Sequence, residues 1–365
     1  MSLANAWNPL LYTFYFLGQS PFPSTSIDSK SYFKRLLLKL PALIIICVSV
    51  YATVHFFNND FYIAWEERGL DVIQVLLILS SLITNLVVAY RCLFRGLLCI
   101  HLQQSFSALE IEVQSSLPSR TLHLMKFRNV FLMKCVTMVI LYAALVFAMV
   151  MSRVKKEYST TSLMIVLAFN IDFCALQVVL YVDLIKFFLK ATTDTFRDIN
   201  SDKAKCDKEA FAKTELLTSI RKLYSSIYKI VGKVNEHFGL ILLTYIVQQF
   251  LVIAYYVFWI LLNKFKMGIW TSMDNTFVLA CATISLFFVS DSCHQVCVEA
   301  QKIGSFLCEN DYLIREEGQR LLTQTINQPM QITAMEFYKL DRSFFAAVTV
   351  GGITTAIMLV QFQDY

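Results

Sequence analysis

The chain has 365 residues, of which 56% are hydrophobic and 16% are charged. A soluble domain of this length cannot bury so much apolar surface in its cores, so the composition excludes an ordinary globular protein and indicates a chain in contact with membrane lipids. The formal net charge of +5 is explained by basic loops and points to no nucleic-acid partner.

Seven segments are apolar and long enough to cross about 30 Å of hydrocarbon. In chain order they cover about 37–57, 70–90, 130–151, 163–185, 238–262, 277–292 and 344–362. The short apolar run 10–18 before them lacks the basic start and the cleavage site of a signal peptide, so we expect the first helix to insert uncleaved. The predicted fold is therefore an all-α, seven-transmembrane helical protein.

Lysine and arginine are concentrated in the segment before the first helix and in the second, fourth and sixth loops. Basic residues in short flanks stay cytoplasmic, so this distribution predicts the N-terminus inside and the C-terminus outside. Arg153, Lys155 and Lys156 in the third loop run against the distribution without reversing it. The ten cysteines then lie in helices or on the reducing side, where we expect no disulfides.

The long inner loops carry apolar residues at intervals of three and four among lysines and acids, over 186–236 and again over 297–322. This spacing is typical of amphipathic helices. We expect the spanning helices to continue into the cytoplasm and to pack there against each other or against partner subunits. A helix lying on the membrane surface is the alternative.

Polar residues inside the second and fourth segments mark a candidate ligand site. Such groups are costly in hydrocarbon and by default mark a cavity, an ion path or a pair. Asn170 and Asp172 lie in the outer half of the fourth helix, on roughly opposite faces, and Gln74 lies near the outer end of the second. Asp183 is nearer the inner end, where we expect it to pair with Lys186.

The fifth helix offers the best ligand wall. Aromatic and amide side chains fall along one of its faces at helical spacing, namely Tyr245, Gln248, Gln249, Tyr256 and Trp259. Aromatic rings stack on apolar or sugar ligands and amides supply directional hydrogen bonds, so the mixture fits a small-molecule pocket. Aromatic packing, with Trp259 anchored at the membrane interface, is the alternative.

On the seventh helix, steps of about 100° per residue place Gly351, Thr354, Met358 and Gln361 on one small and polar stripe. A glutamine near the end of a final membrane helix is costly unless it faces protein or water, so the stripe fits the lining of an ion pore. Met358, one turn from Gln361, is a candidate hydrophobic constriction. An ordinary helix interface is the alternative.

Two other features of the seventh helix bear on a pore. Thr355 and Phe362 fall on a second face, which we expect to pack. The adjacent Gly351 and Gly352 weaken the helix in its middle and form a candidate gating hinge, or else allow a close contact between helices.

Catalytic constellations are not evident. The five histidines are scattered, and Cys293, His294 and Cys297 form a lone cluster whose i, i+4 cysteine pair is more often packing than a metal site. We therefore expect no enzyme activity, no metal and no cofactor.

The last seventy residues resemble the insect gustatory receptors, members of the insect chemoreceptor superfamily. The last helix of that family ends in Thr-Tyr, four hydrophobic residues, then Gln-Phe. Thr355, Gln361 and Phe362 match at the right spacing, and 357–360 supply the hydrophobic residues. Ala356 stands where the family has tyrosine. The approach to the signature is also similar, through Glu299-Ala300, Gln328-Pro329, Phe337 and Leu340-Asp341-Arg342-Ser343.

The resemblance implies a tastant-gated, non-selective cation channel in the plasma membrane of chemosensory neurons. Four like subunits, as a homo- or hetero-tetramer, would place their last helices around one pore, with Gln361 lining it and Met358 as the gate. The implied organisation has a cytoplasmic segment 1–36, six helices with an outer-half ligand cavity over 37–292, anchor helices over 293–343, and a pore helix with an extracellular tip over 344–365.

Another class of seven-helix receptor, an odorant receptor or a G-protein-coupled receptor, is the alternative. A G-protein-coupled receptor would have its N-terminus outside, against the distribution of basic residues. A transporter would show paired broken helices at mid-membrane, which the sequence does not suggest.

Overall fold

Long apolar helices make up most of the computed structural model, which describes residues 12–15, 17, 19, 39–55, 71–116, 124–151, 158–201, 208–262, 269–309 and 316–363. The helices, in chain order, are α3 (Leu40–His55), α5 (Asp71–Phe94), α6 (Gly96–Ser116), α7 (Leu124–Met151), α8 (Tyr158–Ser201), α9 (Lys208–Leu262), α10 (Ile269–Glu309), α11 (Glu316–Asn327) and α12 (Arg342–Gln363). Most of the predicted segment 1–36 and the tip residues 364–365 lie outside the described residues.

Seven of these helices coincide with the seven predicted spans. Six are long and apolar enough to cross a membrane: Ile73–Phe94, Met125–Met151, Ile165–Thr195, Glu215–Leu262, Met273–Cys308 and Arg342–Phe362. The first span is the shorter apolar helix Leu40–Tyr51. Helices are expected here because hydrocarbon offers no hydrogen-bond partner, so each segment must pair its own backbone groups. The prediction of an all-α fold with seven spans is confirmed.

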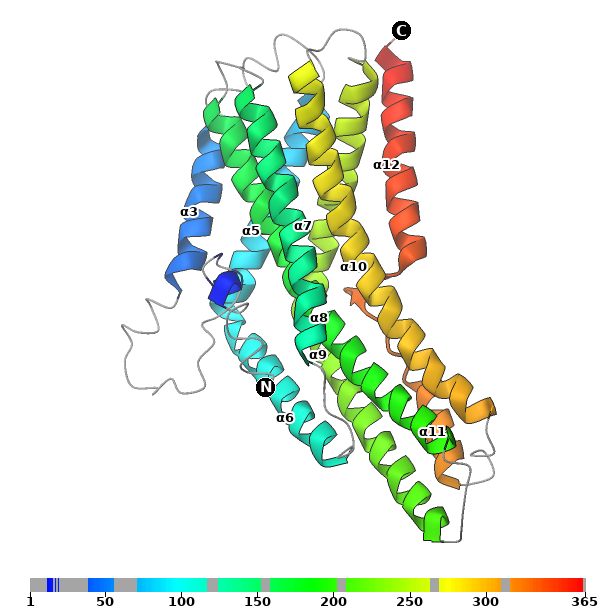
Figure 1. Ribbon diagram of the computed structural model, residues 1–365. Helices are drawn as coiled ribbons and strands as arrows, with labels where there is room; N and C mark the ends of the chain where they lie inside the picture. Colours follow the sequence, from blue (N-terminus) through cyan, green and yellow to red (C-terminus); the bar gives the residue numbers. More distant parts are fainter. Residues whose placement is uncertain are drawn as a thin grey trace.

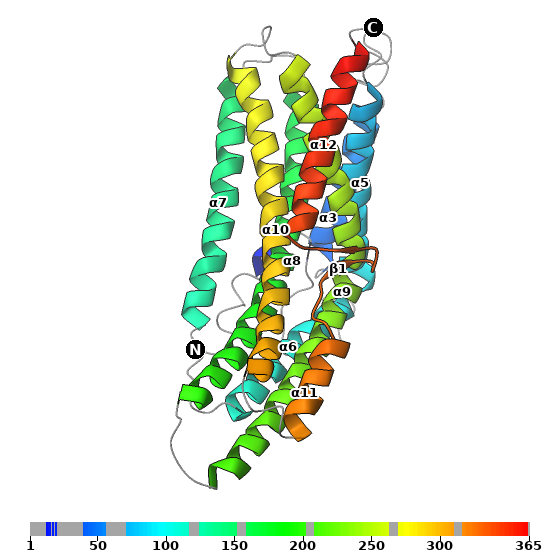
Figure 2. The same cartoon turned by 90° about the vertical axis from the view of Figure 1, so that its right-hand side faces the viewer.

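Three helices run far beyond the length of a membrane span. With 55 residues, α9 is about 80 Å long at 1.5 Å per residue, against about 30 Å of hydrocarbon. Figures 1 and 2 show that α8, α9 and α10 continue past the apolar bundle at one end, where α6 and α11 join them. The expected helical character of the long loops is therefore observed in the described residues, as direct extensions of the spans.

Large aromatic side chains fill the junction between the bundle and these extensions. The rings of Phe106 on α6 and Tyr181 on α8 lie 5.8 Å apart, and those of Tyr181 and Phe238 on α9 lie 5.4 Å apart. The ring of Phe188, further along α8, lies 6.5 Å from that of Phe106. All four residues are almost fully buried, so α6, α8 and α9 share one apolar core here.

A small hairpin connects α11 to α12. Its strands β1 (Thr333–Ala334) and β2 (Tyr338–Lys339) are antiparallel, and Phe337 N–H donates to the Ala334 carbonyl at 3.1 Å. Met335 and Glu336 at the turn have φ of 52° and 64°, values that Asn and Gly adopt more readily. The hairpin was not predicted, because its turn lacks the residues that usually mark one.

Asn235 on α9 holds the hairpin in place. Its Nδ2 donates to the Gln331 carbonyl at 2.9 Å, and its Oδ1 accepts from Thr333 N–H at 3.1 Å. We expect Asn235→Ala to lose both hydrogen bonds and to destabilise the protein by about 2 kcal/mol, measured by thermal or denaturant unfolding of the purified chain. Gln331→Ala is the control, since it keeps the carbonyl acceptor; an equal loss in both variants would contradict the assignment.

Candidate functional site

The N-terminal end of α12 is defined by a helix cap and by an ion pair to the rest of the bundle. Asp341 caps the helix, since its Oδ1 accepts from Phe344 N–H at 2.9 Å. The Arg342 guanidinium donates from Nε and Nη2 to Oδ1 of Asp291 on α10, at 2.9 Å and 2.6 Å. The seventh spanning helix therefore starts from a defined position beside α10.

One face of α12 packs closely on α9, its main neighbour. Val348, Gly352 and Ala356 recur every fourth residue and are buried, Ala356 completely. A Cβ atom at Gly352 would lie 2.8 Å from Cγ2 of Ile253 on α9, so the two helices approach each other at this glycine. Ala356, the position of the missing family tyrosine, belongs to this buried face and not to the predicted pore stripe.

The predicted pore stripe lies on the other side of α12. Thr354, Met358 and Gln361 are exposed in the subunit, Met358 at 53%, and Gly351 is half-buried at the edge of the stripe beside Phe250. In Figure 1 the helix stands at the side of the bundle. The structure thus keeps the four predicted residues together, three of them facing away from their own subunit.

The second predicted face of α12 does not behave as one packed surface. Thr355 is half-buried and its hydroxyl donates to the Gly351 carbonyl at 2.9 Å. Phe362 is 79% exposed, so it does not pack within the subunit. Phe362 lies near the end of α12, beyond the contacts that bury Ala356.

Asp172 lies at the centre of a buried polar network between four helices. Its carboxylate accepts from the Tyr142 hydroxyl on α7 at 2.7 Å and from Gln249 Nε2 on α9 at 2.9 Å. The hydroxyls of Ser285 on α10 and Tyr245 on α9 lie beside it, 2.8 Å from each other. The predicted pocket residue therefore joins α7, α8, α9 and α10.

Asn170 belongs to a second network, directed toward α5. Its Nδ2 donates to Asn85 Oδ1 at 2.8 Å, and its own Oδ1 accepts from Gln19 Nε2 at 2.8 Å. Gln248 on α9 also points to α5, where its Nε2 donates to Ser81 Oγ at 3.2 Å. The neighbouring amides Gln248 and Gln249 thus contact different helices, and the predicted face of α9 is divided between two networks.

The remaining predicted ligand residues lie nearer the end of the bundle where α12 ends. Tyr256 packs against the buried cluster of Leu77, Val252 and Ala282. Trp259 is half-buried, and among the described residues its Nε1 has no hydrogen-bond partner. Gln74 on α5 is half-buried, one turn before Leu77. Among the described residues none of these three shares a hydrogen bond with Asp172 or Asn170.

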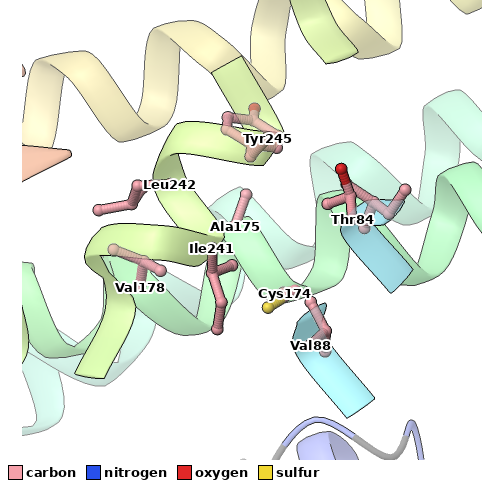
Figure 3. A pocket seen from close by; sticks show the side chains of 9 residues that line it. Thr84, Val88, Cys174, Ala175, Val178, Ile241, Leu242 and Tyr245 are labelled. Atoms are coloured by element: carbon pink, nitrogen blue, oxygen red, sulfur yellow. The ribbon is translucent and has the colours of Figure 1, made fainter. Parts of the chain in front are cut away.

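A narrow crevice runs between α5, α8 and α9 beside the Asp172 network (Figure 3). Its lining is mostly apolar: Thr84, Val88, Ile171, Cys174, Ala175, Val178, Ile241, Leu242 and Tyr245. The crevice is too narrow to admit a water molecule. Tyr245 lines it with its ring and reaches Ser285 with its hydroxyl, so the crevice and the polar network share this side chain.

Besides Gln19, which precedes the first span, four residues of the two networks were not predicted: Tyr142, Ser285, Asn85 and Ser81. The available signal was their polarity inside apolar spans, and Ser81 and Asn85 also lie one turn apart on α5. A hydropathy average hides single polar residues, whereas a search for each polar group within a span would have found them.

The expected pairing of Asp183 with Lys186 is wrong. Asp183 accepts from Lys134 Nζ on α7 at 2.7 Å, and Lys134 also donates to Ser292 Oγ on α10 at 2.9 Å. Lys186 instead donates to Gln295 on α10. The sequence interval made the local pair plausible, but the helix contacts bring a basic residue from a distant part of the chain closer to the carboxylate.

Comparison with known proteins agrees with this architecture. A model of the 7tm chemosensory receptor family matches residues 8–365. Two solved structures of the insect olfactory receptor OR5 from Machilis hrabei share the fold: the complex with eugenol, at 11% identity and a TM-score of 0.63, and the receptor alone, at 13% and 0.64. Each comparison covers 98% of this chain and 98% of the other.

No curated protein sequence matches the chain. The family match extends over nearly the full length, well beyond the last seventy residues that carried the resemblance. Together with the seven spans and the shared fold, it establishes that this chain belongs to the 7tm chemosensory receptor family.

Proposed function

We propose that this chain is a gustatory receptor subunit, and that four such subunits, identical or related, form a tastant-gated, non-selective cation channel. One observation carries the proposal: α12 exposes its polar stripe away from its own bundle. In the apolar window of α12 only 11% of the residues are buried, against 78% in α8. Exposed Thr354 and Gln361 are costly in lipid, so this face calls for water or protein partners.

A ring of four α12 helices gives this face of each helix both water and protein partners. The stripe of Gly351, Thr354, Met358 and Gln361 then faces a water-filled axis, while Gly352 and Ala356 keep each helix on its own α9. Met358 forms the hydrophobic constriction and Gln361 the polar lining beside it. The tastant binds among the helices of each subunit, near Asp172, Asn170, Gln248, Tyr256, Trp259 and Gln74. In this arrangement the protein is a channel of the plasma membrane, and no enzymatic step is required.

An odorant receptor is the second candidate, favoured by the fold shared with OR5 from Machilis hrabei. Odorant and gustatory receptors of this architecture would differ in their ligands and not in the pore. The resemblance of the chain's last seventy residues to gustatory receptors supports taste. A G-protein-coupled receptor would place the N-terminus outside, so a glycosylation acceptor attached there and modified in cells would contradict the channel topology.

Current recording tests the proposed function. Cells that express the chain are exposed to a panel of bitter, sugar and volatile compounds, and we expect at least one compound to open a cation conductance. A tetramer is expected for the purified protein, alone or with a related subunit. A well-expressed monomer, or a tetramer that conducts with none of the compounds in lipid bilayers, would contradict the proposal.

Charge changes at Gln361 test the pore assignment. Four added carboxylates in Gln361→Glu should raise the preference for cations over anions several-fold, and Gln361→Lys should lower it, because the charges stand on the ion path. Reversal potentials in asymmetric salt give the measurement. Val360→Glu, with the charge at the neighbouring position but about 100° away around the same helix, is the control; equal shifts at both positions would remove Gln361 from the pore.

A further inference from the structure

Asp172 differs in its surroundings from Asp183 and Asp291, two other acids of the bundle. Asp183 is paired with Lys134 and Asp291 with Arg342. Asp172 is only 3% exposed, yet none of the ion pairs among the described residues includes it. A buried carboxylate without an opposite charge is costly, and neutral hydrogen bonds offset only part of that cost.

The environment of Asp172 also has more acceptors than donors. Gln249 donates its Nε2 to the carboxylate, while its own Oε1 has no donor among the described residues. Gln249 is 97% buried, since its exposed fraction is 3%. The site therefore lacks a positive charge and hydrogen-bond donors.

We propose that the ligand of this site carries a protonated amine, whose ammonium group binds the Asp172 carboxylate in place of the Tyr142 hydroxyl and the Gln249 amide. This inference rests on the proposed function and names its ligand class. An ammonium group brings a charge and up to three donors and no acceptor, whereas each hydroxyl of a sugar brings an acceptor with every donor. The ammonium group therefore supplies the positive charge and the hydrogen-bond donors that this site lacks.

Aromatic rings packed on Tyr142, whose hydroxyl reaches the carboxylate, favour the same ligand. The rings of Tyr142 and Phe169 meet edge to face at 5.0 Å, and that of Phe173 lies 4.3 Å from Phe169. Faces of aromatic rings attract cations in addition to the carboxylate. The apolar part of a small amine would lie in the adjoining crevice, which is reached past Tyr245 (Figure 3). Since that crevice is closed, binding must move side chains.

The exchange of hydrogen bonds at Asp172 couples ligand binding to the pore helix α12. Gln249 is followed by Phe250, whose Cε2 would lie 3.4 Å from a Cβ atom at Gly351 on α12. One turn along α9, Ile253 contacts Gly352. When the ammonium group takes the carboxylate, Gln249 is released, and the α9 segment 249–253 that carries α12 loses this hydrogen bond to α8. This gives two discrete arrangements that binding can select.

Binding to the purified full-length protein tests the inference with two probes of one shape. The probes are 2-phenylethylamine, protonated at neutral pH, and 2-phenylethanol, its neutral counterpart; both are titrated at fixed sodium and followed by thermal unfolding. We expect the amine to bind at least about tenfold more tightly than the alcohol, because a hydrogen bond to a charged group is the stronger one. Asp172→Asn should remove this difference.

Tyr142→Phe provides a second variant with the opposite sign. In the wild type the Tyr142 hydroxyl competes with the ammonium group for Asp172, so the loss of this hydroxyl should raise the affinity for the amine several-fold. A purely structural tyrosine would leave the affinity unchanged, and one that binds the ligand would lower it. Three results would each overturn the inference: equal affinities for the two probes, an unchanged amine affinity in Asp172→Asn, or a protein that sodium stabilises in place of the amine.

The inference and the proposed function fail in distinguishable ways. Amine binding that depends on Asp172 in a protein that never conducts would refute the channel and retain the ligand class. Currents that neutral compounds evoke equally in the wild type and in Asp172→Asn, with no response to the amine, would retain the channel and refute the ligand class.

Discussion

Gly352→Ala is expected to push α12 away from α9, whereas Gly351→Ala is expected to be tolerated. A Cβ atom at Gly352 would lie 2.8 Å from Ile253 Cγ2 and 3.2 Å from its Cβ, a branched side chain on a buried face. At Gly351 the nearest atom is Phe250 Cε2 at 3.4 Å, an ordinary contact with a ring that can shift. Both changes raise helix propensity by about 1 kcal/mol, so the difference between them isolates the steric effect.

Overpacking at such a contact costs about 1 to 3 kcal/mol, or roughly a five- to 150-fold change in an equilibrium constant. In Gly352→Ala that cost falls on the described arrangement of α12, so the ligand concentration for half-maximal current and the unfolding temperature should both change. Gly351→Ala should stay close to the wild type in both. Similar behaviour of the two variants would show that the glycines act as a flexible hinge and not through the contact with α9.

The missing family tyrosine follows the same geometry. Ala356 lies one turn beyond Gly352 on the buried face and is 0% exposed. A tyrosine there needs space that this packing of α12 on α9 does not leave. The sequence showed the departure from the family signature, but only the structure shows that it concerns packing between helices within one subunit.

The sequence was sufficient for features that depend on averages over many residues. Hydropathy located the spans because an unbroken run of about twenty apolar residues is typical of a membrane helix. The pore stripe was predicted because a helix has a fixed period, and the structure keeps Thr354, Met358 and Gln361 on one exposed side. Features with a strong local signal of this kind do not require knowledge of neighbouring helices.

Contacts between particular helices could not be predicted in the same way. The period placed Gln248 and Gln249 on one broad face of α9, yet the first contacts Ser81 on α5 and the second Asp172 on α8. A change of one residue rotates the side chain by about 100°, enough to reach a different neighbour. For Asp183 the partner, Lys134, is 49 residues away in sequence. Local spacing therefore limits the face of a residue but does not identify its partner.

Exchanging the charges of Arg342 and Asp291 should restore the ion pair at the start of α12, which either single change removes. The guanidinium meets one carboxylate oxygen at 2.6 Å and 2.9 Å, and the same carboxylate accepts from Gln295, which in turn accepts from Lys186. This chain of hydrogen bonds ties the start of α12 through α10 to α8. Asp291 has a side-chain exposure of only 15%, so the loss of Arg342 leaves a carboxylate with little access to water.

We expect Arg342→Ala and Asp291→Ala each to destabilise the described position of α12 by on the order of 1 kcal/mol. Both should move the ligand concentration for half-maximal current in the same direction, by roughly fivefold, because they release the same helix end. The double variant Arg342→Asp with Asp291→Arg should return most of the way to the wild type, and the four proteins together give the coupling energy. Additive effects, with no recovery in the exchanged pair, would show that α12 is held at its N-terminal end by the Asp341 cap and the hairpin and not by this ion pair.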